Sequence, residues 1–116
     1  MGAVTVNNLG EIRISDDVLA TLAGISAIGC YGIVGMASKR ATDGLVELLG
    51  SENLSRGVKV TTQGNEITID LFIIVEYGIS IAAVAQNIID TVKYNVENLT
   101  GVTVKKVNIK VEGVRV

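Results

Sequence analysis

Residue types that commonly carry chemistry are absent from this chain or nearly so. Its 116 residues include no histidine, no tryptophan and no proline, and the one cysteine is Cys30. Without histidine the chain lacks the commonest general base and metal ligand, and a lone cysteine forms neither an intramolecular disulfide nor a zinc-binding pair. We therefore expect no catalytic residue, no cofactor and no metal. Cys30 is interpreted as a buried structural thiol in a reducing compartment.

Aromatic side chains and net charge are also scarce. Aromatic residues make up 3% of the chain and the formal net charge is −2. Nucleic-acid binding usually needs a basic surface and stacking platforms, so this composition disfavours it. Hydrophobic residues, at 48%, are mostly aliphatic, and they predict a packed aliphatic core in one domain spanning residues 1–116.

The C-terminal half carries the clearest structural pattern. It predicts a strand over Glu66–Tyr77, an amphipathic helix over Ser80–Leu99 and a second strand over Val104–Val116. A strand, a crossover helix and a returning strand form a βαβ unit, so we expect the two strands to be parallel. Alternation on the first strand points one apolar set toward the helix, while Phe72 and Ile74 on its other face also call for cover. That strand is therefore expected at the centre of the sheet.

Further elements are expected before this unit. Val58–Thr62 reads as a strand joined to the next by a tight Gly64-Asn65 hairpin. Val4–Val6 and Glu11–Ile14 read as short strands at a sheet edge, and residues 42–50 as a short helix. The predicted fold is α+β, a small mixed sheet with element order β-α-(α)-β-β-α-β and helices covering the sheet.

Val18–Ser38 is a run of 21 residues without a charge. Its length would allow a membrane span. Four glycines weaken such a helix, however, and the sheet would lose its second cover. We therefore favour a buried helix, capped by Ser15, followed by a glycine-rich turn. Its apolar stripe is expected to contain Val18, Leu22, Ile25 and Gly29, and the segment is expected to cover Phe72 and Ile74.

The glycine-rich turn admits three interpretations. The simplest is a tight packing turn, because closely spaced glycines indicate positive φ or close backbone contact. A GXXG-like loop at Gly32–Gly35, followed by Lys39 and Arg40, would instead bind RNA. A third interpretation is an exposed apolar docking patch for a protein partner. The candidate partner-binding residues are Tyr31, Gly32, Ile33, Val34, Gly35, Met36 and Lys39.

Several separated motifs together are similar to one known family. They are Gly10–Ser15, Cys30–Lys39, Glu76–Gly78, Val84-Ala85, Val92–Tyr94, Thr100-Gly101, Val107–Ile109 and Gly113-Val114. This ordered set, spread over about Val4 to Val116, resembles the alkaline-shock-protein family of Gram-positive bacteria, in particular its short YloU-like branch.

The resemblance implies a non-enzymatic cytoplasmic protein of the envelope stress response. It implies self-association into a homo-oligomer and a protein partner anchored in the membrane, with the chain itself peripheral to the inner face and not spanning it. It supplies no catalytic residues. The family positions present here are Tyr31, Gly32, Val34, Gly35, Met36, Tyr77, Gly78 and Asn108.

Overall fold

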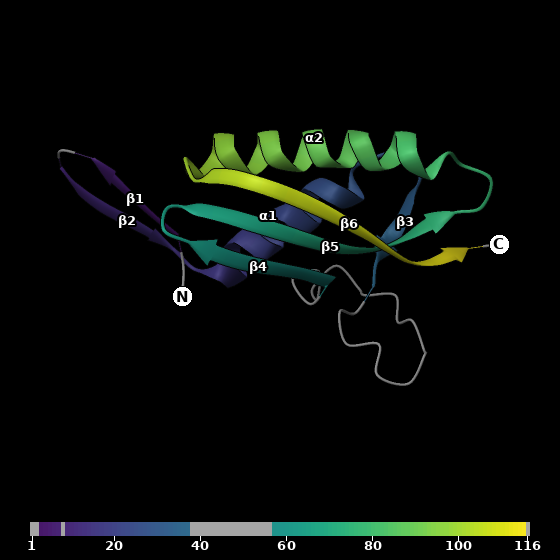
Figure 1. The fold of residues 1–116 in the computed structure, drawn as a ribbon, viewed down its shortest axis with the longest axis horizontal. Helices are drawn as coiled ribbons and strands as arrows, with labels where there is room; N and C mark the ends of the chain where they lie inside the picture. The colour runs from purple at the N-terminus through teal and green to yellow at the C-terminus, as the bar shows by residue number, and fades with distance from the viewer. Residues whose placement is uncertain (1–2, 8, 38–56, 116) are drawn as a thin grey trace.

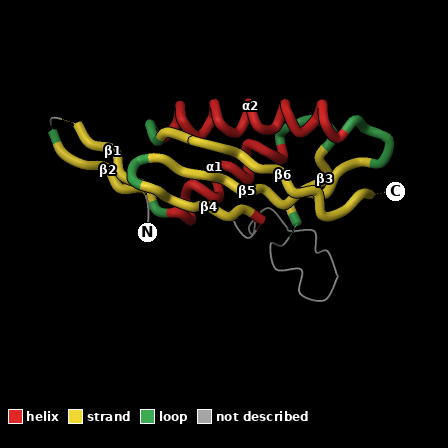
Figure 2. The backbone as a smooth tube through the Cα atoms, viewed as in Figure 1, coloured by secondary structure: helices red, strands yellow, loops and turns green. Residues whose placement is uncertain are grey.

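The computed structural model describes residues 3–7, 9–37 and 57–115. The elements, in chain order, are β1 (Ala3–Asn7), β2 (Gly10–Ile14), α1 (Asp16–Ile28), β3 (Ile33–Met36), β4 (Val58–Gln63), β5 (Glu66–Glu76), α2 (Ile81–Thr100) and β6 (Thr103–Arg115). Figures 1 and 2 show two helices packed on a twisted sheet, so the predicted α+β class is confirmed. The short helix expected over residues 42–50 lies outside the described residues.

Strand β5 is the centre of a mixed sheet, as its pattern predicted. β6 runs parallel to it over its whole length, and Glu66 pairs with Thr103 at one end and Glu76 with Arg115 at the other. The opposite edge of β5 is shared by two antiparallel strands: β4 pairs with its first half and β3 with its second. The βαβ prediction of two parallel strands around α2 is therefore confirmed.

Some of the local irregularities in the sheet coincide with glycine positions. Gly64 begins the β4–β5 hairpin with φ +63°, and the pairing of Gln63 with Glu66 leaves a two-residue loop, as predicted. In β6 the register shifts between the partners of Ile73 and Ile74, next to Gly113, where a glycine inside a strand favours a bulge. A second shift, between the partners of Ile67 and Thr68, has no glycine beside it.

Strand β3 was not predicted. The strand is short, and its register against β5 shifts between Ile33 and Gly35, which marks a bulge.

Both helices lie on the same face of this sheet (Figure 1). Five alternating residues of β5 are buried between the sheet and the helices: Ile67, Ile69, Leu71, Ile73 and Val75. The prediction that α1 covers Phe72 and Ile74 is therefore wrong. Those two side chains stay half-buried on the other face, where the Lys110 ammonium lies 5.5 Å from the Phe72 ring centroid. An antiparallel or mixed sheet can leave one face partly solvated, so the fold does not require a second helical cover there.

Helix α1 buries Leu19 together with four small residues and leaves its other large side chains outward. Ser15 caps it as predicted, because its Oγ accepts a hydrogen bond from the Val18 backbone N–H at 3.2 Å. The buried residues are Leu19, Ala20, Ala23, Gly24 and Ala27. The expected stripe of Val18, Leu22, Ile25 and Gly29 is therefore not the core-facing side. Small residues let α1 approach the sheet closely, and this packing overrides the preference for burying the bulkier stripe.

Helix α2 follows its predicted pattern except at its two ends. Val84, Ile88, Val92 and Val96 are buried, as expected from the apolar stripe, and Gly101 ends the helix in the left-handed conformation at φ 75°. Ile81 and Leu99, the apolar residues at the two ends of the helix, are exposed. The Ser80 side chain makes no capping hydrogen bond, although Ser80 occupies the N-cap position.

Strands β1 and β2 form a separate two-stranded sheet. They pair antiparallel from Ala3–Ile14 to Asn7–Gly10, and the hairpin extends beyond one end of the main sheet in Figure 1. The two strands were predicted, but their place at an edge of the main sheet was wrong.

The uncharged run that begins at Val18 is divided between α1, a turn and β3. Among the described residues, no helix combines the length and the apolar character needed to cross a membrane.

Candidate functional site

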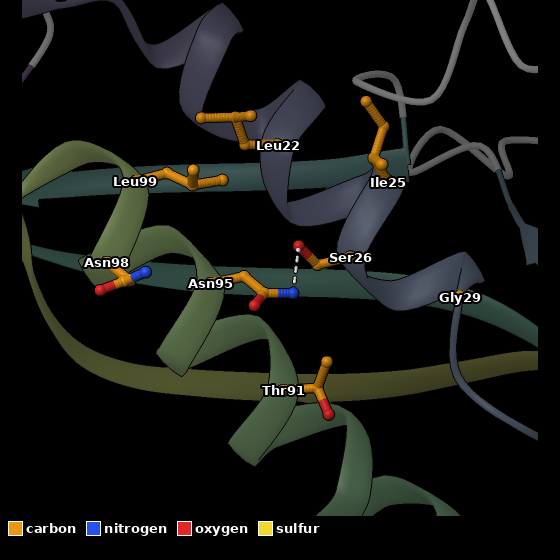
Figure 3. A pocket seen from close by; sticks show the side chains of 8 residues that line it. All are labelled: Leu22, Ile25, Ser26, Gly29, Thr91, Asn95, Asn98 and Leu99. Atoms are coloured by element: carbon orange, nitrogen blue, oxygen red, sulfur yellow. Dashed lines mark hydrogen bonds between the residues drawn. The ribbon is translucent and has the colours of Figure 1, made fainter.

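A groove of about 480 Å³ runs between α1 and α2, on the side of the helices that faces away from the sheet (Figure 3). Its described lining residues are Leu22, Ile25, Ser26 and Gly29 from α1 and its C-cap, and Thr91, Asn95, Asn98 and Leu99 from α2. All of these are uncharged. The groove is thus formed by aliphatic groups, hydroxyls and side-chain amides.

One polar contact joins the two walls of the groove. The Asn95 Nδ2 donates a hydrogen bond to the Ser26 Oγ at 3.2 Å. The backbone carbonyl of the same serine accepts a hydrogen bond from the Cys30 Sγ at 3.5 Å. Cys30 is buried, as predicted. The Asn95–Ser26 bond links the two helices, whereas the Cys30–Ser26 bond lies at the C-terminal turn of α1.

The groove offers contact surface but no reactive group. Ser26 and Thr91 supply hydroxyls, yet none of the described lining residues is a base that would activate them. Amide side chains do not titrate and therefore do not act as general acids or bases. Within the described part of the chain, no cluster of histidine, cysteine, aspartate or glutamate is arranged to hold a metal ion.

Apolar side chains stand exposed along the rim. Ile25 is 53% exposed on α1 and Leu99 is 68% exposed on α2. Val18 and Ile28 on α1 and Tyr94 on α2 are exposed as well, outside the described lining of the groove. Isolated exposed apolar residues are normal, but a set gathered around one uncharged groove is typical of an interaction surface.

The candidate partner-binding residues proposed from the sequence lie partly on the surface and partly in the core. Tyr31 is 82% exposed and lines a second pocket of about 360 Å³ at the start of α2. Ile33 and Val34 are half-buried, while Gly35 and Met36 are buried. Met36 therefore cannot belong to an exposed docking patch as the structure stands. Lys39 lies outside the described residues.

Gly32 is a packing position, as the simplest interpretation of the turn expected. Its φ is +89°, and a Cβ there would lie 3.0 Å from Ile79 Cδ1 and 3.0 Å from Val84 Cγ2. The GXXG-like interpretation is wrong in its geometry, because the three residues that follow Gly32 belong to strand β3 and not to a loop. A strand already paired with β5 has no free loop backbone with which to clamp a nucleic acid.

The groove itself was missed at the level of sequence, although its signal was present. Leu22, Ile25 and Gly29 were recognised as one helical face, and they are the wall that α1 contributes. The error was to assign that face to the core of the same chain. An apolar helical stripe shows that a helix face avoids water, but it does not show what covers the face.

Comparisons with known proteins place the chain among envelope-related proteins. The model of the alkaline-shock-protein family, which is described by a cell envelope-related function, matches residues 4–116. The chain is 54% identical over 108 residues to YloU of Bacillus subtilis strain 168, an uncharacterized protein, and the match covers 92% of this chain and 90% of that protein. It is 24% identical over 106 residues to a stress response regulator gls24 homolog of Streptococcus pyogenes, covering 91% of this chain and 59% of that protein.

Among solved structures, the chain is similar to MamM CTD H264E. The TM-score is 0.51 at 13% identity, and the match covers 84% of this chain and 93% of that one. This likeness concerns the fold alone.

Proposed function

Because the chain belongs to the alkaline-shock-protein family, whose function is related to the cell envelope, we propose that it is a non-enzymatic scaffold or adaptor of the envelope stress response. In this proposal residues 1–116 act as one alkaline-shock-like domain. The domain self-associates and binds a protein partner at the inner face of the cell membrane, without spanning the membrane itself. Stress-response relatives in Gram-positive bacteria support the setting.

The observation that carries this proposal is the uncharged groove between α1 and α2. When a partner covers aliphatic rim residues such as Ile25 and Leu99, the complex is stabilised by about 25 cal/mol per Å² of apolar surface removed from water. The groove supplies no described nucleophile with a base, so its chemistry fits contact and not catalysis.

Tyr31 provides a second candidate contact at the start of α2. Tyrosine is common at protein interfaces, because its ring buries a large area at low entropic cost and its hydroxyl still finds a polar partner. The pocket beside Tyr31 is also lined by Gly78, Ser80 and Asn87. This arrangement supports Tyr31 as a partner-binding residue in a role separate from that of the groove.

A capture experiment tests the proposed function. The full chain, tagged at one end, is incubated with detergent-solubilised membranes from a Gram-positive bacterium, beside Tyr31→Ala and Ile25→Glu variants. We expect the wild-type chain to retain an envelope protein, and at least one variant to retain about tenfold less of it. An equal background of retained proteins for all three chains, together with a strictly monomeric wild-type chain, would contradict the proposal.

A further inference from the structure

Strand β6 has one edge that pairs with no other described strand. The strand is 13 residues long and pairs with β5 along its other edge. At its beginning the Val104 N–H donates a hydrogen bond to the Glu97 Oε2 of α2 at 2.9 Å. At its end the Arg115 carbonyl accepts a hydrogen bond from the Tyr77 N–H at 3.0 Å. Between these two points, β5 is the one described bonding partner of the β6 backbone, and residues 108–115 are half-buried or exposed. Such an edge presents backbone donors and acceptors to which a further strand can pair.

The charge of β6 is strongly biased to one sign. Its one acidic residue is Glu112. Its four cationic residues, all exposed, are Lys105, Lys106, Lys110 and Arg115. The ion pair found among the described residues joins two side chains of β2, so none of the four cations has an acidic partner in the described part of the chain.

Lys106 and Lys110 are the two cations best placed to select a partner strand. Their partners on β5 are both uncharged, namely Thr68 and Phe72. The acidic residue between those partners, Asp70, already accepts a hydrogen bond from the Asn108 Nδ2 at 2.8 Å. Lys106 and Lys110 are four residues apart on one face of the strand, which is about 13 Å along it. A strand added at the edge would therefore meet both lysines with side chains that are also four residues apart.

We propose that the free edge of β6 binds an extended, acidic segment of a protein partner, which joins the main sheet as a further strand. The backbone of the segment pairs with residues 105–114, and two carboxylates four residues apart lie beside Lys106 and Lys110. This edge is separate from the groove between α1 and α2. The inference therefore adds a second contact surface to the proposed function and does not rest on the groove.

The same lysines disfavour other occupants of the edge. Lysine on an edge strand opposes pairing between two copies of the chain, because two β6 edges would bring like charges together. An anionic lipid surface or a nucleic acid is attracted by the lysines, but the whole chain carries a net charge of −2, so this attraction is weak. An acidic strand combines the charge attraction with directional hydrogen bonds to the edge backbone.

NMR titration of the isotope-labelled full chain with synthetic peptides tests the proposal. The first probe is a peptide of about nine threonine and serine residues that includes two glutamates four residues apart. One control peptide has lysines in place of the glutamates, and another keeps the glutamates but is methylated at alternate backbone nitrogens. We expect the glutamate peptide, at up to about 2 mM, to shift the amides of residues 105–114, and the lysine peptide to leave them unchanged. Backbone methylation is expected to weaken binding at least about tenfold, because it removes hydrogen-bond donors.

Charge reversal at the two lysines sharpens this test. The double variant Lys106→Glu, Lys110→Glu is expected to bind the glutamate peptide at least about tenfold more weakly and to bind the lysine peptide instead. Lys93→Glu is the matched control, because Lys93 is an exposed lysine on α2 and the change in charge per site is the same. If the double variant lowers the melting temperature, Lys106→Gln, Lys110→Gln replaces it and is expected to lose binding without gaining the lysine peptide.

Each other outcome overturns the inference. These outcomes are no shift with the glutamate peptide, equal binding of the two charged peptides, undiminished binding of the methylated peptide, and an equal loss in Lys93→Glu. Vesicles of phosphatidylglycerol are a further probe. Lysine-dependent co-sedimentation with these vesicles, without peptide binding, would assign the lysines to a lipid surface and overturn the inference as well. None of these measurements involves Ile25 or the groove, so the capture experiment judges the proposed function separately.

Discussion

At the scale of single residues, glycine conformations carry the clearest structural information. Gly32 and Gly78 have nearly the same positive φ, +89° and +87°. A Cβ on Gly32 would meet the side chains of Ile79 and Val84, whereas a Cβ on Gly78 would meet nothing within 4 Å. The Gly32 carbonyl also accepts a hydrogen bond from the Glu76 N–H at 3.0 Å, which ties the turn to the end of β5. A side chain at Gly78 would therefore meet backbone strain alone, whereas a side chain at Gly32 would meet both backbone strain and steric crowding.

Alanine substitution at these two glycines is expected to have unequal effects. Gly78→Ala introduces only the strain of a non-glycine residue at positive φ, about 1–2 kcal/mol of unfolding free energy. Gly32→Ala adds overpacking against α2, so its total loss is expected to be about 2–4 kcal/mol. Urea denaturation of both variants beside the wild type measures the difference. Equal losses at the two positions would show that the crowding at Gly32 is relieved without cost.

The density of glycines predicted that Gly32 lies in a tight packing turn. It did not predict that the residues after Gly32 form a strand. Closely spaced glycines indicated positive φ or tight backbone contact, and Gly32 has both. Gly35 instead lies in β3, where the same residue type accompanies a bulge. A glycine pattern does not distinguish a turn from a bulged strand, because both exploit the missing Cβ.

At the scale of elements, a strict hydrophobic periodicity predicted the buried face correctly, and a weak one did not. β5 alternates over its whole length, so its buried face followed from the pattern. α1 is apolar nearly all round, so periodicity alone could not decide which side faces the sheet. The deciding factor is that Ala20, Ala23 and Ala27 allow close approach to strands already filled with isoleucine and valine side chains.

The β1–β2 hairpin is expected to be the least stable of the described elements. It pairs only with itself, and a two-stranded hairpin without further packing is marginally stable in water. Its Leu9 is 99% exposed and Ile12 is also exposed, whereas the half-buried Ile14 packs against the core.

Hydrogen exchange followed by NMR at low protein concentration checks this difference between elements. Amides in the hairpin are expected to exchange at least about 100-fold faster than those of β5, whose pairing on both sides opens only with global unfolding. β4 serves as the control, since it also pairs with a single strand but packs against the core through Val58. Hairpin protection equal to that of β5 in dilute solution would contradict this ranking.

At the scale of the whole molecule, both helices gather on one side of the sheet. This arrangement closes one core and leaves two surfaces of different character. On the open sheet face, polar pairs such as Asn108 Nδ2 donating to Asp70 Oδ1 at 2.8 Å lie beside the Lys110–Phe72 contact. The helical side instead presents the uncharged groove. Sequence patterns predicted the described elements except β3. The side of the sheet on which α1 packs was not predicted, because it depends on contacts between segments distant in sequence, which local periodicity does not encode.

The central claim is that the interhelical groove is the surface through which this protein makes its proposed protein–protein contacts, self-association included. The most direct test is to compare amide NMR spectra of the full chain at about 20 and about 500 µM protein. We expect concentration-dependent shifts confined to residues 22–29 of the α1 wall and 91–99 of α2, and their absence in Ile25→Glu. Spectra that do not change with concentration, or shifts centred on Tyr31 and the start of α2, would contradict the claim.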